Sequence, residues 1–140
     1  MPIRRNRVFF LPGLLFLASC SPKADIEQAT KLAEHIHEQL RAGQYEAVYQ
    51  SADPDFRNTA TLDAFARFET TVTQKLGALQ SAELADFHVL YGFRDARVRL
   101  DYNCVYENGQ AKEVFEIRQR DNKSALSAYR IDSPLLPESR

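Results

Sequence analysis

Residues 96–120, "ARVRLDYNCVYENGQAKEVFEIRQR", have the clearest structural pattern in the chain. Apolar and polar residues alternate through its first eleven positions, and this period of two predicts a strand with one buried face. The dipeptide Asn108-Gly109 favours a two-residue hairpin turn of type I′, in which both central residues have positive φ. A second strand should therefore return over 111–120. The inward residues of this hairpin are expected to be Ala96, Val98, Leu100, Tyr102, Cys104, Tyr106, Phe115 and Ile117.

Two further strands are predicted beside this hairpin. The segment "ALSAYRID" (125–132) follows a turn within "RDNKS" (120–124), and residues 80–91 form a less regular first strand that ends in a turn at 92–95. Neighbouring strands joined by short turns pair as an antiparallel meander. Further inward residues are expected at Leu84, Phe87, Val89, Tyr129 and Ile131.

The first half of the chain has helical spacing instead. Asp25 is a candidate cap for a first helix that Gly43 ends, and a shorter helix is predicted around 45–49. "SADPDFRNT" (51–59) interrupts the pattern with a turn, and a third helix is predicted over 62–76. Helices followed by an antiparallel meander indicate an α+β fold, with three N-terminal helices packed on one face of a four-stranded antiparallel sheet.

The N-terminal segment has the features of a secretory signal. Three arginines precede an apolar run at residues 8–17, which is too short to span a bilayer. The run ends in "LASC" (17–20), which resembles the lipobox of bacterial lipoproteins. That resemblance implies a signal peptide at 1–19, a lipid on Cys20, a short lipidated tether at 20–24 and a single domain at 25–140. The alternative is an ordinary secretory signal with a chance cysteine.

The residue after the cysteine bears on localisation. In Gram-negative lipoproteins an aspartate there favours the inner membrane, so Ser21 implies the periplasmic face of the outer membrane. In a host with a single membrane, the same signal implies the outer face of the cell membrane.

Charge and cysteine content exclude several classes. The signal holds three of the 18 basic residues and none of the 19 acidic ones, which leaves the mature chain at −4. This balance argues against nucleic acid as a partner. After Cys20 only Cys104 remains, and it is expected to be a buried, unreactive apolar residue.

Several segments carry a family resemblance: "LRAGQYEAVYQSADPDFR" (40–57), "KLGALQSAEL" (75–84), the hairpin at 98–117 and "YRI" (129–131). Together they resemble small bacterial lipoproteins of unknown function, whose domain is related to the cystatin-like and nuclear-transport-factor-like α+β folds. Leu126 stands where such proteins are expected to have a tryptophan. The resemblance covers about residues 27–132 and implies no particular chemistry. A tetratricopeptide repeat is disfavoured because only one partial copy, "GQYEAVY", is present.

No catalytic, cofactor or metal motif is apparent. His35 and His37 are two apart on the predicted helix and cannot chelate one ion, and His88 is alone in its strand. All three histidines are expected at the surface or at a rim. The acidic pairs Asp53/Asp55 and Asp63/Glu69 are expected to be helix caps and solvated faces.

Recognition is the remaining class. Arg97 and Arg99 are expected on the outer face of the sheet, as a solvated face or as a docking surface for an envelope protein. Tyr49 and Tyr102 are core aromatics or part of a small-molecule pocket. The predicted function is a membrane-anchored binding or envelope-assembly module without catalysis; the alternative is an envelope hydrolase or an inhibitor of a periplasmic enzyme. A polar pocket with a buried histidine or carboxylate would favour the enzyme.

Overall fold

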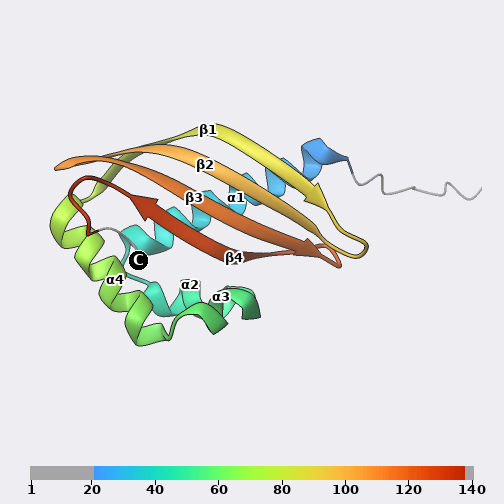
Figure 1. Ribbon diagram of the computed structural model, residues 1–140, viewed down its shortest axis with the longest axis horizontal. Coiled ribbons are helices and arrows are strands. Elements are labelled where there is room, and N and C mark those ends of the chain that lie inside the picture. Colours follow the sequence, from blue (N-terminus) through green and yellow to red (C-terminus); the bar gives the residue numbers. More distant parts are fainter. Residues whose placement is uncertain (1–20, 138–140) are drawn as a thin grey trace, which may run out of the picture.

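The computed structural model describes residues 21–137, so the predicted signal peptide (1–19) and the predicted lipid site Cys20 lie outside the described residues. The helices are α1 (Pro22–Arg41), α2 (Tyr45–Ser51), α3 (Pro54–Thr59) and α4 (Leu62–Leu76). The strands are β1 (Leu79–Tyr91), β2 (Ala96–Tyr106), β3 (Gly109–Arg120) and β4 (Lys123–Asp132), and they form one antiparallel sheet in the order β1-β2-β3-β4 (Figure 1).

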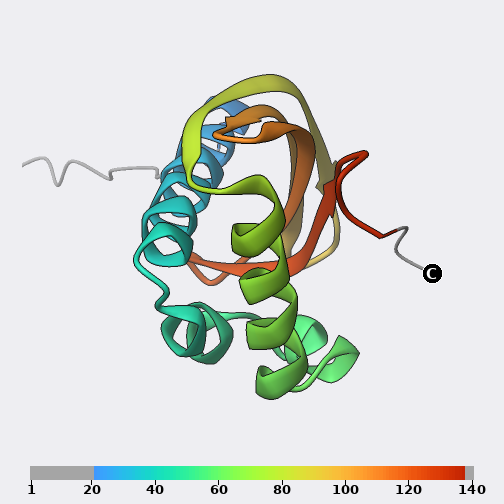
Figure 2. The ribbon, with the colours of Figure 1, turned by 90° about the vertical axis from the view of Figure 1, so that its left-hand side faces the viewer.

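The helices pack on one side of this sheet, as predicted. Figure 2 shows the sheet curving around α1 and α4, which lie on its concave side. The core lies between these two layers, and its largest fully buried apolar side chains are Phe115, Leu76, Leu100, Ile117, Val48 and Val98.

The alternation predicted for β2 is confirmed. Every second residue from Ala96 to Tyr106 is buried, and Cys104 among them is 2% exposed. The edge strand β1 is less regular, with register shifts near Leu79 and Leu84. Phe87 pairs with Leu100 and so shares its face, yet it stays 46% exposed because an edge strand has a neighbour on one side only.

The hairpin between β2 and β3 is present, but its turn differs from the prediction. Tyr106 pairs with Gly109, which makes Glu107 and Asn108 the loop, and neither Asn108 nor Gly109 has positive φ. Backbone contacts to the end of α4 hold this loop, since Asn108 N donates to the carbonyl of Leu76 at 2.9 Å. The close approach of Leu135 favours glycine at position 109, because a Cβ on Gly109 would lie 3.0 Å from a methyl carbon of Leu135. Tertiary contacts thus override the local preference of Asn-Gly.

A turn with the predicted dihedral signs occurs one hairpin later. Asp121 and Asn122 join β3 to β4 with φ of 50° and 58°, as a type I′ turn requires. Asp and Asn tolerate this left-handed region better than other non-glycine residues.

The N-terminal boundary of the domain also differs from the prediction. A tether to residue 24 with Asp25 as cap is wrong, because α1 begins at Pro22. Ser21 caps the helix by accepting a hydrogen bond from Ala24 N, and proline is favoured at the first helical position. Ser-Pro is therefore the start signal of the helix.

The other helices agree closely with the prediction, with one addition. The helix over 62–76 is confirmed, and Gly77 with φ of 75° ends it. A short helix, α3, replaces the turn expected behind Asp53, whose side chain accepts a hydrogen bond from Asp55 N.

Candidate functional site

A cluster of polar side chains lies inside the core, between α1 and the sheet. His37 Nε2 lies 2.7 Å from Glu113 Oε2, and a carboxylate accepts, so the imidazole donates. Tyr106 donates its hydroxyl to the other oxygen, Glu113 Oε1. The rings of Tyr102 and Phe115 pack edge-on against His37, with centroids 5.5 and 5.0 Å away. The histidine and the carboxylate are thus held between hydrogen bonds and aromatic rings.

Two periodic patterns place this pair in the core. Glu113 lies two residues from Ala111 and two from Phe115, so it occupies an inward position of β3 and is fully buried. His37 lies four residues after Ala33, one turn along the buried face of α1. The expectation that His37 lies at the surface or at a rim is therefore wrong.

A second buried carboxyl group, Glu69 of α4, faces a pocket beside this cluster. The pocket has a volume of about 560 Å³ and lies at the C-terminal end of α1. Its apolar lining includes Leu40, Tyr45, Val72 and Leu79, while Glu69, His37 and Tyr106 supply polar groups. Glu69 is 3% exposed, and its Oε1 has no hydrogen-bond partner. We call this site the Glu69 pocket.

The environment of Glu69 changes its protonation. Burial, with the charge of Glu113 as a second cause, raises the pKa of Glu69 to about 8. At neutral pH the side chain is therefore mostly an uncharged carboxylic acid, which can donate one hydrogen bond and accept others. The predicted solvated position of Glu69 is wrong, because the residue falls at helical spacing between Phe65 and Val72 on the buried face of α4.

Cys104 adjoins the cluster. Burial and the carboxylate of Glu113 raise the pKa of the Cys104 thiol well above its usual range. The same two causes raise the pKa of the Tyr106 hydroxyl. The prediction of a buried cysteine is confirmed. A protonated, buried thiol is a poor nucleophile.

His37, Cys104 and Glu113 also present ligand atoms that all lie within 4.8 Å of one another. Both oxygens of Glu113 already accept hydrogen bonds, and the thiolate that a metal requires is disfavoured. The arrangement therefore favours a hydrogen-bonded network over a metal centre.

The two tyrosines that the sequence offers as pocket residues make contacts that stabilise the fold instead. Tyr49 donates its hydroxyl to the carbonyls of Arg57 and Ala60, and its ring packs against Phe56. Tyr102 is 4% exposed, and burial is the main cause that raises its pKa to about 12. Neither residue lines the Glu69 pocket.

The two arginines lie on the outer face of the sheet, as expected. Arg99 forms a bidentate ion pair with Asp101, with contacts from 2.9 to 3.2 Å, and Arg97 is exposed. Neighbouring Arg118 is only 12% exposed in its side chain, and it pairs with Asp53, Asp55 and Asp95. The outer face thus holds no continuous row of unpaired basic side chains through these positions.

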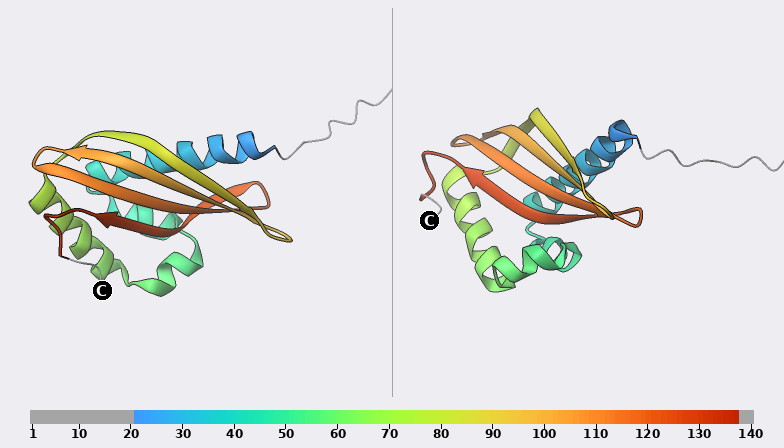
Figure 3. Two further views of the ribbon diagram at one scale, coloured as in Figure 1. Left: turned by 45° about the horizontal axis from the view of Figure 1, so that its top comes forward. Right: turned by 45° about the vertical axis from the view of Figure 1, so that its right-hand side comes forward.

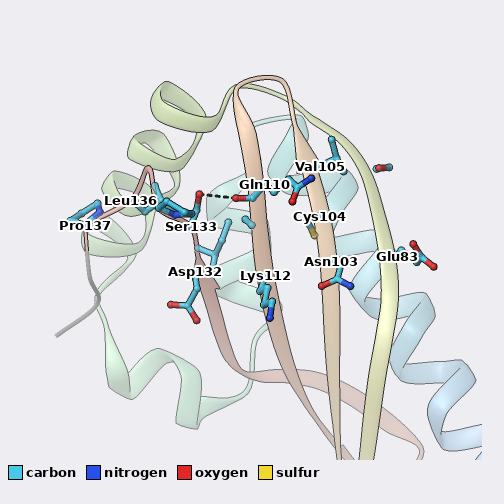
Figure 4. Close-up of a pocket in the computed structure, with 14 residues that line it drawn as sticks. Glu83, Asn103, Cys104, Val105, Gln110, Lys112, Asp132, Ser133, Leu136 and Pro137 are labelled. Carbon is cyan, nitrogen blue, oxygen red and sulfur yellow. Dashed lines mark hydrogen bonds between the residues drawn. The ribbon is translucent and has the colours of Figure 1, made fainter.

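A larger depression, of about 850 Å³, lies on this outer face near the C-terminal segment (Figure 4). Asn103, Lys112 and Asp132 are among its exposed polar lining, and Ser133 Oγ donates to the carbonyl of Gln110 at 2.8 Å. Cys104 also lines it, although its sulfur lies behind the strand. No buried side chain with an unpartnered polar atom lines this depression within residues 21–137, so we place the candidate site at the Glu69 pocket.

Sequence reasoning missed His37, Glu69 and Glu113. The signal for Glu113 was present, because an acidic residue occupied an inward position of an alternating strand. Glu69 interrupted the apolar face of a predicted helix in the same way. Which carboxylate meets which histidine depends on how α1 crosses the sheet, and no local pattern encodes that crossing.

Comparisons with known proteins identify the fold only. No protein-family model matches the chain, and no curated protein matches its sequence. Among solved structures, a variant of a designed protein of the nuclear-transport-factor-like class, titled Rd1NTF2_05, is similar with a TM-score of 0.54. The match has 14% sequence identity and covers 77% of this chain and 99% of that protein. The fold is thus of the nuclear-transport-factor-like α+β type. None of the helices within residues 21–137 is long and apolar enough to cross a membrane.

Proposed function

We propose that the chain is a bacterial lipoprotein, anchored through Cys20 to the periplasmic face of the outer membrane, whose domain binds a small molecule in the Glu69 pocket. The anchor and its membrane are supported by "LASC" and by Ser21 after it. The observation that carries the binding function is the unpartnered Oε1 of a buried carboxyl group that lines a pocket of about 560 Å³. A buried polar atom without a partner is destabilising, and a ligand that supplies the missing hydrogen bond removes that cost.

The lining of the pocket defines the class of ligand. Leu40, Val72 and Leu79 favour an apolar body, while an uncharged Glu69 favours a neutral polar group such as a hydroxyl or a carbonyl. An anionic ligand group beside Glu69 would approach the carboxylate of Glu113 as well. We therefore expect a neutral, largely apolar small molecule with one hydrogen-bonding group.

The test uses N-phenyl-1-naphthylamine, a neutral apolar dye whose fluorescence rises on binding. Thr73 lines the pocket from an exposed position on α4, so Thr73→Trp should fill the opening without disturbing the core. We expect roughly tenfold or greater loss of dye affinity, equivalent to about 1.4 kcal/mol.

The matched control is Gln74→Trp, which adds the same side chain at the next position of α4, outside the pocket lining. This variant should bind the dye as the wild type does. Equal affinity in the two variants, or no binding to the wild-type protein, would contradict ligand binding at the Glu69 pocket.

A hydrolase is the second candidate, and the hydrogen bond between His37 and Glu113 favours it. A carboxylate that orients an imidazole is a common part of acid–base sites. The hydroxyl groups that line the pocket belong to Thr73, Tyr45 and Tyr106. A ligand that is chemically converted by the wild type, and recovered unchanged from a His37→Gln variant that still binds it, would favour the enzyme over the binding module.

A further inference from the structure

One end of the domain is fixed beside the proposed lipid site. Ser21 directly follows Cys20 in the chain and caps α1, so the folded domain begins one residue after the acylated cysteine. No residue separates Cys20 from the cap of α1, and consecutive Cα atoms are about 3.8 Å apart, so the proposed lipid site lies directly beside the folded domain. If Cys20 carries a lipid, as the proposed function requires, the first turn of α1 must lie at the surface of the bilayer.

Two turns of the sheet lie at this same end (Figure 3). Tyr91 Oη donates to Asp25 Oδ2 at 3.0 Å, and Gln119 Nε2 donates to the carbonyl of Asp25 at 2.8 Å. These bonds join the first turn of α1 to the ends of β1 and β3. We call the first turn of α1, the turn at 92–95 and the turn at 121–122 the anchor end.

The anchor end exposes large apolar side chains. Phe93 in the turn at 92–95 is 98% exposed, and at the adjoining end of β1 Leu90 is 71% and Tyr91 57% exposed. The other large apolar residues that are exposed within 21–137 (Phe87, Phe68, Val105 and Leu135) do not exceed 46%. Large apolar side chains that are almost fully exposed can mark an interaction surface, and Phe, Leu and Trp side chains are common on segments that enter the membrane interface.

Charged side chains surround these apolar residues. Lys23, Arg94, Arg120 and Lys123 are exposed there, and Asp25, Asp95 and Asp121 are their acidic neighbours. The guanidinium carbon of Arg94 lies 5.9 Å from the centroid of the Phe93 ring, and Arg120 pairs with Asp95 at 3.4 Å. Long basic side chains beside an inserted ring can reach lipid phosphates while the ring lies deeper.

We propose that the anchor end is a membrane-contacting surface, in which Phe93 and Leu90 insert into the interfacial region of the bilayer that holds the lipid on Cys20. Arg94 and Arg120 contact the phosphates of that leaflet. The lipid and the apolar tip then act together as two attachments that fix the orientation of the domain.

The chain has no tryptophan, so one introduced indole reports its own position. The acylated protein carrying F93W is reconstituted into vesicles of phosphatidylethanolamine and phosphatidylglycerol, with and without lipids brominated on their acyl chains. We expect blue-shifted emission for F93W, and loss of most of its fluorescence with the brominated lipids. A second reporter, L90W, should behave in the same way.

The matched control is V105W, since Val105 is exposed on β2 at the opposite end of the sheet. Its emission should be that of an indole in water, with no quenching by the brominated lipids. Unquenched F93W and L90W in acylated protein would overturn the membrane contact, as would stronger quenching of V105W. The mass of the purified protein separates the two proposals, because an unmodified Cys20 contradicts the lipid anchor itself.

Discussion

At the scale of single residues, the most informative side chain is Glu69. Burial of its carboxyl group, with the charge of Glu113 as a second cause, raises its pKa from 4.5 to about 8. Between these two pH values the folded chain holds a proton that the unfolded chain has lost. Stability must therefore fall as pH rises through this range.

We predict that Glu69→Gln removes this pH dependence. The amide has nearly the same shape and no titration, so its stability should exceed that of the wild type by a margin that grows with pH. The margin should increase by up to about 1.4 kcal/mol per pH unit between 4.5 and about 8. Urea denaturation at a series of pH values measures it. A control at an exposed site, Glu34→Gln, should leave the wild-type profile unchanged, and parallel profiles for both variants would contradict a buried neutral Glu69.

At the scale of elements, β2 determines which residues enter the core. Leu100 is fully buried, whereas its neighbour Arg99 lies on the outer face in an ion pair with Asp101. We predict that Leu100→Ala lowers the free energy of unfolding by about 2–5 kcal/mol, through lost burial and a cavity. Arg99→Ala should change it by less than about 0.5 kcal/mol, because an exposed ion pair contributes little. A shift of one residue in register would reverse these two results, so the comparison tests the register itself.

The elements also show how far sequence reasoning extends. Hydrophobic periodicity was sufficient for β2 and for α4, because a buried face imposes its own period on the chain. The prediction of a type I′ turn at Asn108-Gly109 was wrong because a hydrogen bond to Leu76, far away in sequence, fixes the backbone of Asn108. The candidate site was missed for a related reason: His37 and Glu113 are 76 residues apart, and only the packing of α1 on the sheet brings them together. Local pattern predicts which face is buried, but not which polar groups meet there.

At the scale of the whole molecule, the proposed anchor depends on one thiol. We predict that Cys20→Ser leaves an uncleaved precursor that incorporates no labelled palmitate, because serine cannot accept the diacylglyceryl group that precedes cleavage. Metabolic labelling measures the incorporation of palmitate, and the electrophoretic mobility of the protein in cell fractions shows whether the precursor is cleaved. Cys104→Ser is the matched control, and it should keep the label. Unchanged labelling of the Cys20 variant would contradict the lipid anchor.

The length of α1 sets the distance between the proposed lipid on Cys20 and the Glu69 pocket. The helix has 20 residues and therefore spans about 30 Å, with Ser21 at one end and the Glu69 pocket at the other. With lipid on Cys20 and α1 directed away from the membrane, the pocket opens at a height comparable to the thickness of the hydrocarbon layer. A ligand dissolved in the bilayer would have to leave it and cross water to arrive there. If the domain binds a ligand in this pocket, as proposed, the ligand must arrive from the aqueous side, on a carrier or by free diffusion, and this limits how insoluble it can be.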